Sequence, residues 1–494
     1  MGVIISSRLA SVALTMSLAA CAVGPNFKRP APPVAAGYGS APSQGETPSV
    51  DVPGGAQQRF VAGMDVPAQW WTLFQSPTLT QLVEQAMQGN PDVASARAAL
   101  RQAQELYAAQ RTSFFPVVQG GFSATRNKNA VGTISNPTTL PQESPYYNLY
   151  TAQLSVSYLP DVFGGTRRTV EASKAQVDNN RFQLEATYLT LSSNVVVTAV
   201  QEASLRGQIA ATTRLLELQQ QLTETVRGQQ TFGTASQLDA LSQESAEAQT
   251  AATLPPLQKQ LGQTRDALTA LLGRLPAEEP EETFQLEQLT LPAELPVSLP
   301  SSLIAQRPDV LAAEENMHRA SAEVGVALAN MLPQFTINAN TGSNALQIGQ
   351  LFGTGSGFWT VGASLTQTLL DAGALLHEKR AADAALDQAA AQYRAAVILA
   401  CQNVADTLRA LQADAESLKA SAATERAAKR TFELAQSQQK LGTLSPVAVL
   451  NAEQTYQQAQ MALIQAQASR YSDTAALFQA LGGGWWNRAE GVSK

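Results

Sequence analysis

The 494-residue sequence has little of what catalytic and metal centres are built from, since it contains two His, two Cys and seven Met. A zinc site with four His or Cys ligands would use up Cys21, Cys401, His318 and His377, whose spacing shows no ligand pairs. The seven Met form no cluster of the kind that binds copper or silver. The sequence therefore predicts no metal site, no disulfide framework and no bound cofactor.

Charged residues and enzyme motifs are also scarce. Asp, Glu, Lys and Arg make up 15% of the chain and the net charge is −7. The 33 Lys and Arg are scattered, without the dense basic stripe that phosphate neutralisation needs, which argues against nucleic acid as a partner. The motifs GxxxxGK(S/T), GxSxG and HExxH are missing, and the sequence predicts a protein that is not an enzyme.

Residues 1–20 have the pattern of an export signal, with Arg8 before an apolar stretch that is too short to span a bilayer. The signal ends in Leu-Ala-Ala followed by Cys21, which resembles a bacterial lipobox and predicts lipidation of Cys21. The alternative is an ordinary signal peptide with a Cys at the cleavage site. Eight prolines follow in residues 21–67, which predicts a lipidated, Pro-rich tether.

The chain contains an internal repeat. Asn90-Pro91-Asp92-Val93 matches Arg307-Pro308-Asp309-Val310, and Gly233-Thr234 matches Gly442-Thr443 with nearly the same separation along the chain. Because the separation between matching motifs is nearly constant, the chain is predicted to contain two copies of one structural unit. The predicted domains are a first repeat at 68–273, a connector at 274–299, a second repeat at 300–482 and a C-terminal tail at 483–494.

Each repeat predicts a helix, a hairpin, a very long helix, a turn and a last helix. Segments 77–113 and 308–331 predict helices of moderate length, and the Pro-free segments of about 166–230 and 373–440 predict the long ones. A helix of that length extends about 100 Å and needs neighbouring helices to pack against. Apolar residues at 3,4 spacing predict such a seam along Leu408, Leu411, Ala415, Leu418 and Ala422.

Apolar and polar residues alternate in four segments, at about 116–127, 148–160, 333–341 and 358–370, which predicts four strands. The alternative is a half-buried sheet of a soluble domain, but the lengths approach the span of about ten residues that a membrane strand needs. Four strands cannot close a barrel, so a membrane barrel would be oligomeric. Two chains would give eight strands, and three would give twelve and room for a lumen.

The sequence resembles the TolC-like outer membrane factors, in their lipoprotein branch (NodT/OprM type) that serves efflux systems of the resistance-nodulation-division (RND) type. The resemblance covers nearly the whole chain after the signal. It rests on Cys21-Ala22-Val23-Gly24-Pro25-Asn26-Phe27-Lys28-Arg29-Pro30, Asn90-Pro91-Asp92, Arg307-Pro308-Asp309, Asp161-Val162-Phe163-Gly164-Gly165 and Leu441-Gly442-Thr443. It implies a mainly α-helical chain with a membrane β-barrel, and a homotrimer with a 12-stranded barrel and a 12-helix periplasmic tunnel.

The resemblance also implies a function. The chain is expected in the outer membrane, lipid-anchored, as the passive exit duct for drugs or other small molecules. Its implied partners are a periplasmic adaptor (membrane fusion) protein, an inner-membrane RND pump and outer-membrane lipid. Alternatives within the family are type I protein secretion and metal-cation efflux. An alternative of another class is a lipid-tethered coiled-coil scaffold or binding module.

The two turns that follow the long helices are the candidate site, because in this family they form the tips that contact the adaptor. The expected tip residues are Gly233, Thr234, Ala235, Ser236, Gly442, Thr443, Leu444 and Ser445. In the family, acidic residues after the second turn narrow the closed pore, but this chain has Ala448 and Asn451 there. Ala448 corresponds to Asp239 in the first repeat, where three copies would form an acidic ring. The simpler interpretation of Asp239 is a helix cap three residues after Ser236.

Two tryptophan pairs, Trp70-Trp71 and Trp485-Trp486, have two interpretations. They suit anchors at a membrane interface, and they suit packing among the helices. We favour packing among the helices.

Overall fold

The computed structural model describes residues 23–32, 37–39, 45–128 and 146–488. The chain divides into two compact units, and each combines segments of both repeats. Unit 1 comprises Met1–Arg29, Arg101–Asp178 and Glu315–Ala391, and unit 2 comprises Pro30–Leu100, Asn179–Glu314 and Gln392–Lys494. Within the described ranges, no helix combines the length and the apolarity needed to cross a membrane.

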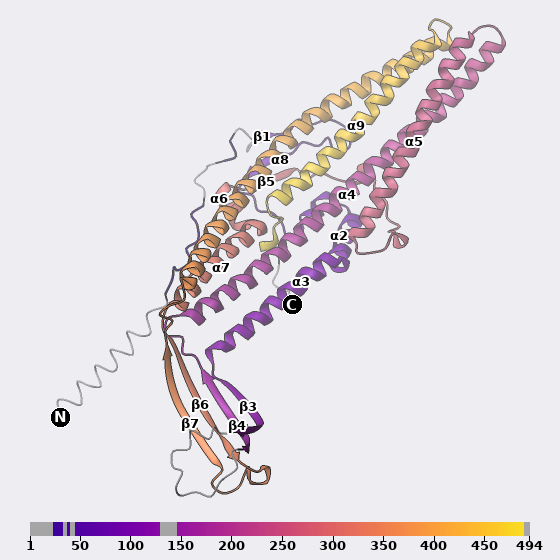
Figure 1. Cartoon of the computed structure of the whole chain (residues 1–494). Helices are drawn as coiled ribbons and strands as arrows, with labels where there is room; N and C mark the ends of the chain where they lie inside the picture. Colours follow the sequence, from indigo (N-terminus) through magenta and orange to yellow (C-terminus); the bar gives the residue numbers. More distant parts are fainter. Residues whose placement is uncertain (1–22, 33–36, 40–44, 129–145, 489–494) are drawn as a thin grey trace, which may run out of the picture. The chain divides into compact units, whose positions relative to one another are not determined.

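The order of elements is the same in both repeats (Figure 1). The first repeat contains α2 (Pro77–Gly89), α3 (Pro91–Arg111), β3 (Val117–Lys128), β4 (Tyr146–Tyr158), α4 (Gly165–Thr231) and α5 (Gln237–Leu271). The second contains α6 (Pro300–Gln306), α7 (Pro308–Asn330), β6 (Gln334–Ala345), β7 (Gly357–Thr366), α8 (Ala374–Lys440) and α9 (Pro446–Ala480). The long helices α4 and α8 have 67 residues each.

The expectation of one helix over 77–113 is wrong, because α2 ends at Gly89 and α3 begins at Pro91. Asn90 separates them in an extended conformation, and its side chain accepts a hydrogen bond of 2.8 Å from the backbone N–H of Asp92. The side chain of Asn90 thus caps α3, while the missing N–H of Pro91 suits a first helical position.

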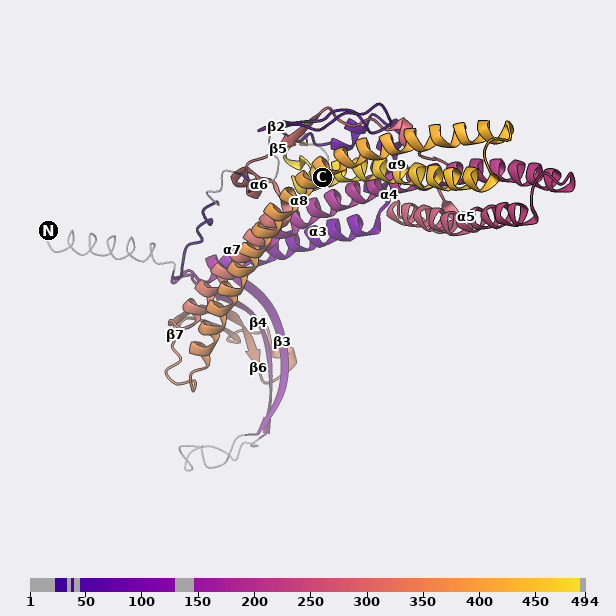
Figure 2. The ribbon, with the colours of Figure 1, turned by 90° about the horizontal axis from the view of Figure 1, so that it is seen from above.

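Unit 1 contains a four-stranded antiparallel sheet in the order β3-β4-β6-β7. Its strands curve along their length (Figure 2). Residues directly opposite each other share a face, so Val118, Val156, Ala339 and Val361 form one apolar row across the sheet. The face that carries this row is solvent-exposed: Trp359 on it is 78% exposed.

Unit 2 contains both tryptophan pairs in its packing. Trp70 and Trp71 are buried, and the ring of Trp70 stacks on Phe478 at 5.4 Å between centroids. Trp485 lies against Phe182 at 5.8 Å, and its ring N–H donates to the carbonyl of Gln306 at 2.7 Å. These contacts favour packing among helices over a membrane interface. The seam on α8 is buried throughout, as predicted, at Leu408, Leu411, Ala415, Leu418 and Ala422.

The second half of the expected tether contains two short strands. β1 (Gly45–Glu46) and β2 (Arg59–Ala62) form a small sheet with β5 (Glu294–Val297) of the connector. The buried guanidinium of Arg470 in α9 holds this segment, donating to the hydroxyl of Thr47 at 2.8 Å and to the carbonyl of Ala56 at 2.6 Å. Strand pairing and these charge-assisted bonds satisfy backbone groups that a free linker would leave to water.

Candidate functional site

The two predicted turns have the same backbone geometry. Gly233 and Gly442 end the long helices with positive φ angles of 74° and 72°, where a side chain would be strained. The N–H groups of the following residues, Thr234 and Thr443, reach back to the carbonyls of Gln229 and Gln438, at 2.9 and 3.0 Å. We call residues 232–236 the first tip and residues 441–445 the second tip.

The helices that follow the tips begin with serine caps of different completeness. The hydroxyl of Ser236 accepts from the backbone N–H of Asp239 at 3.1 Å, and the carboxylate of Asp239 accepts from the backbone N–H of Ser236 at 3.0 Å. Ser445 caps α9 through the backbone N–H of Ala448 at 3.4 Å, with Pro446 at the first helical position. Alanine offers no group to return the bond, so only the first tip has a full capping box.

The structure confirms the capping role of Asp239. Its Oδ2 also accepts from the hydroxyl of Ser236 at 2.6 Å, so the carboxylate is turned back to the start of its own helix. These hydrogen bonds, first from the hydroxyl and then from the backbone of Ser236, hold the pKa of Asp239 below its usual range. The carboxylate is therefore an anion at neutral pH. Ala448 is partly exposed and Asn451 is exposed on α9.

The sequence did not single out the residues just behind the tips. Behind the first tip, Glu244 of α5 forms an ion pair with Arg227 of α4 at 2.8 Å, and the Arg227 side chain is 59% exposed. Its counterpart in the second repeat is Glu453 of α9, which is fully buried. Burial raises the pKa of Glu453 to about 7, while the nearby Gln219 amide lowers it. The sequence did contain a sign of this difference. Arg227 corresponds to Gln436, so the second repeat lacks the arginine that pairs with the glutamate in the first repeat.

An apolar cluster closes the second tip. Phe432 and Ala435 of α8 and Val449 of α9 are buried together, with Leu444 of the second tip packed against them. The ring of Phe432 stacks on Tyr456 at 5.9 Å between centroids. Each tip also carries a bulky apolar side chain that is exposed to solvent: Phe232 of the first tip is 85% exposed and Leu441 of the second is 78% exposed. Exposed apolar side chains at a helical tip suit contact with another protein.

Two other sequence expectations concern sites away from the tips. Cys21 lies outside the described residues. Among the residues that the structure places, no group of three or more His, Cys, Asp or Glu side chains could hold a metal ion. His318 packs in unit 1, where its ring stacks on Phe27 at 4.4 Å between centroids.

The chain thus combines a sheet with an exposed apolar face, two long helices and two matching tips. The model of the outer membrane efflux protein family matches residues 82–274 and 299–483. The chain belongs to the outer membrane efflux protein family. As a member of this family it is an efflux protein of the outer membrane, and the two matched segments follow the internal repeat.

Among characterised relatives, the chain is 30% identical over 481 residues to the pyoverdine export outer membrane protein OpmQ of Pseudomonas putida, covering 97% of both chains. It is 28% identical over 490 residues to the probable efflux pump outer membrane protein TtgC of the same species, covering 98% of this chain and 97% of TtgC. Among solved structures, the outer-membrane channel OprN matches with a TM-score of 0.82 at 27% identity, covering 94% of this chain and 100% of that one. The Campylobacter jejuni CmeC outer membrane channel shares the fold, with a TM-score of 0.83 at 22% identity over 94% of this chain and 95% of that one.

Proposed function

We propose that the protein is the outer-membrane exit duct of a tripartite RND-type efflux system and works as a homotrimer. The observation that carries the proposal is the sheet of unit 1. Its apolar face is exposed, and within the described residues each of its outer strands, β3 and β7, pairs with one strand only. Open edges and an exposed apolar face are costly in water but suit a barrel wall in lipid.

Three copies of this sheet give a twelve-stranded barrel. The face opposite the apolar one carries small polar residues, and Gln119, Ser155, Asn340 and Thr360 form one row across it. In a closed barrel this polar face lines a lumen that holds water, and the apolar face meets lipid. In the proposed trimer, the two long helices of each chain, with the shorter helices stacked beside them, form a twelve-helix tunnel.

The cargo is a drug or another small molecule. The names of the relatives, which export pyoverdine or serve efflux pumps, support a small-molecule cargo over a protein one. The protein acts as a passive conduit and not as an enzyme, so the choice of cargo lies with the pump upstream.

The lipid anchor at Cys21 is part of the proposal. Two residues later, the N–H of Val23 donates to the carbonyl of Phe163, just after β4, at 3.0 Å. The guanidinium of Arg168 donates to the carbonyl of Gly24 at 3.3 Å and to the side chain of Asn26 at 2.7 Å. Within unit 1, the chain that follows Cys21 is thus fixed beside the ends of the strands. This docking supports lipid insertion next to the barrel, and mass spectrometry of the mature N-terminus tests it, an unmodified Cys21 being the contrary result.

The tips are proposed to contact a periplasmic adaptor, which links the duct to the inner-membrane pump. Exposed Phe232 and Leu441 at the ends of the two helix pairs support an apolar contact with another protein. We place the periplasmic gate at the same end, where three copies of Asp239 favour cations, while Ala448 and Asn451 leave the second repeat uncharged there.

Membrane insertion without the lipid tests the proposal against the coiled-coil scaffold. A Cys21→Ser variant exported with an ordinary signal peptide should stay in the outer-membrane fraction, need detergent for extraction and give discrete ion-conducting channels in planar bilayers. A variant that is soluble without detergent and gives no conductance would support the tethered scaffold and overturn the duct.

A further inference from the structure

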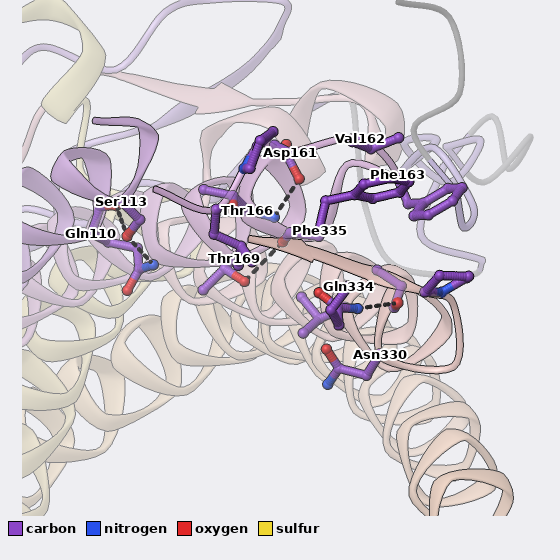
Figure 3. Close-up of a pocket in the computed structure, with 16 residues that line it drawn as sticks. Gln110, Ser113, Asp161, Val162, Phe163, Thr166, Thr169, Asn330, Gln334 and Phe335 are labelled. Atoms are coloured by element: carbon purple, nitrogen blue, oxygen red, sulfur yellow. Dashed lines mark hydrogen bonds between the residues drawn. The ribbon is translucent and has the colours of Figure 1, made fainter. Parts of the chain in front are cut away.

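A pocket of about 280 Å³ lies in unit 1 where the sheet meets the helices (Figure 3). Its lining comes from the loop between β4 and α4, the start of α4, the end of α3 with the short turn after it, the end of α7 and the start of β6. Pockets that enclose a drug-sized ligand have volumes of about 300 to 1,000 Å³. This pocket therefore has room for a small headgroup but not for a complete two-chain lipid.

The lining of the pocket is amphipathic. Phe163 of the β4–α4 loop and Phe335 of β6 point toward each other, with 6.3 Å between ring centroids. Gln110 and Ser113 lie at the other end of the pocket, where the amide of Gln110 donates to the hydroxyl of Ser113 at 3.0 Å. A purely apolar ligand would remove water from these polar groups and offer no hydrogen bond in return. The lining suits a ligand with both a polar and an apolar part.

The pocket lies on the apolar side of the sheet. Phe335 is four residues before Ala339, so it belongs to the face that carries the apolar row. In the proposed duct this face meets lipid, and Phe335 lies near the end of β6 that adjoins the helices. The N–H of Val23, close to the proposed lipid anchor, donates to the carbonyl of Phe163 at 3.0 Å. Both observations place the pocket at the level of lipid headgroups.

One ion pair lies at the pocket. The carboxylate of Asp161 lines it and accepts the backbone N–H groups of Thr166 and Arg167, at 2.9 and 3.0 Å. The Nε of Arg167 lies 3.3 Å from the same carboxylate, and the arginine side chain is 47% exposed against 11% for Asp161. The acidic group is therefore the inner one and the basic group the outer one. A guanidinium has five N–H groups, so Arg167 can also donate to an anion outside the pocket.

This order of charges matches one kind of lipid headgroup. In a phospholipid with a terminal amine, the ammonium is the far end, and the phosphate lies between it and the acyl chains. An ammonium inside the pocket can donate to the carboxylate of Asp161 and to the amide oxygen of Gln110, while the phosphate stays at the rim with Arg167. The acyl chains then continue past Phe335 along the apolar face.

We propose that the pocket binds the headgroup of a membrane phospholipid that carries both a phosphate and a primary ammonium. This site rests on the proposed membrane barrel and adds a specific lipid contact to it. The occupant is a free membrane lipid and not the lipid on Cys21, because an acylated glycerol attached through sulfur has neither the phosphate nor the ammonium that the Asp161–Arg167 pair matches.

Lipid binding to the assembled protein tests the selectivity. Protein extracted in mild detergent and stripped of lipid is given equal amounts of phosphatidylethanolamine and phosphatidylglycerol, and the adducts are counted by native mass spectrometry. Phosphatidylethanolamine should add one molecule per subunit, at lower concentration than phosphatidylglycerol, which lacks the ammonium. Equal binding of the two lipids would overturn the assignment of the headgroup.

The phosphate contact is tested at Arg167. Arg167→Gln should weaken phosphatidylethanolamine binding about tenfold, because a charge-assisted hydrogen bond is lost, while Arg167→Lys keeps the cation and should restore most of the affinity. Arg380→Gln is the matched control, since Arg380 is an exposed arginine near the start of α8, the other long helix. Parental affinity in Arg167→Gln would overturn the site.

A second pair of variants tests the position of the lipid. Ser113 and Thr112 are neighbours in the turn after α3 and both are exposed, but of the two only Ser113 lines the pocket. Ser113→Trp should therefore fill the pocket and abolish the selective adduct, while Thr112→Trp should leave it unchanged. Parental binding in Ser113→Trp would place the lipid elsewhere and overturn the proposal.

Failure of this site is distinguishable from failure of the duct. Trimers that insert into membranes but retain neither lipid would overturn the site and leave the duct intact. An adduct in Cys21→Ser that the parent lacks would show that the anchor's own acyl chains fill the pocket, and would overturn a free lipid as occupant. Protein that neither inserts nor forms trimers would overturn the duct and the site together.

Discussion

The two tips share a turn but differ in what holds their helices together behind it. The first tip has a capping box and the exposed ion pair of Arg227 with Glu244. The second tip has a cap without a returning carboxylate, and behind it a buried apolar cluster around Phe432 with the buried Glu453. The two repeats therefore share the backbone of the turn but differ in the side-chain contacts that hold the two helices together behind it. The first tip depends on contacts that water and salt weaken, and the second on packing.

The substitutions between repeats explain this difference. When the repeats are aligned on Gly233 and Gly442, Phe432 of the second repeat replaces Thr223, and Tyr456 replaces Glu247. A stacked aromatic pair thus stands where the first repeat has a hydroxyl and a carboxylate. The change from Arg227 to Gln436 removes the cation that Glu453 would pair with. We expect the first tip to open more readily than the second.

The largest expected effect is that of Phe432→Ala. Removal of a buried aromatic ring costs about 3 to 5 kcal/mol, and here the loss falls on the α8–α9 pair near the second tip. Hydrogen exchange of the amides in this part of α8 and α9 should speed up strongly. Thr223→Ala is the matched change on the first tip and should cost about 1 kcal/mol. Equal effects of the two changes would show that the second tip is not the better packed one.

The next effect is the pH dependence that Glu453 confers. The pKa of Glu453 is about 7 in the folded protein against 4.5 ordinarily, so the unfolded chain gives up this proton first as the pH rises. The free energy of unfolding should therefore fall between pH 4.5 and 7, by about 3 kcal/mol, and change no further above that. Glu453→Gln should remove this contribution and make the protein more stable than the parent at pH 8, and the smaller fall that remains comes from other groups such as Asp414, whose burial also raises its pKa to about 7.

Glu244→Gln is the control for Glu453, since it changes the corresponding residue at a partly exposed, ion-paired position. Melting temperatures of the detergent-solubilised protein between pH 4 and 8 provide the measurement. If Glu453→Gln melts with the pH dependence of the parent, Glu453 is not the group that responds.

A smaller effect concerns salt at the first tip. Arg227→Gln should change the free energy of unfolding only slightly, because the ion pair with Glu244 is largely exposed and is screened by solvent and salt. Raising the salt concentration should speed hydrogen exchange at the start of α5 in the parent and not in the variant. At the start of α9 both proteins should respond alike, and a salt effect of the same size there would contradict the proposed difference between the tips.

The smallest effect on stability, with a distinct effect on conduction, is expected of Asp239→Asn. Asparagine keeps a side-chain acceptor for the backbone N–H of Ser236, so the cap survives, but the charge is lost. If three copies of Asp239 face the pore, cation selectivity of single channels should drop in Asp239→Asn and rise in Ala448→Asp. Unchanged selectivity in both assembled variants would leave Asp239 with its capping role alone.

Much of the fold could be predicted because it depends on local patterns in the sequence. The Pro-free segments and the two-residue alternation predict the long helices and the hairpins, and β7 and α8 begin within one residue of their expected starts at 358 and 373. The serine caps and glycine turns of both tips are equally local, which is why Ser236 and Gly233 could be placed from sequence alone.

Features that depend on distant residues could not be predicted. In the predicted tether, the side chain of Gln58 is held by the carbonyl of Pro292 in the connector and by Arg470, both far away in the sequence. The burial of Glu453 could not be read from its match with Glu244, because neighbouring helices and not the residue type decide its environment. Sequence also left the cap and the ring as alternatives for Asp239; the hydrogen bonds of its carboxylate establish the cap, and the ring stays a prediction.

Native mass spectrometry of the full-length protein, extracted from outer membranes in mild detergent, tests the central claim most directly. Four strands with open edges at β3 and β7 predict that chains must join before a barrel can close, and a water-filled lumen needs the twelve strands of three chains. The account predicts a trimer as the main species. A folded monomer or dimer as the only species would contradict it.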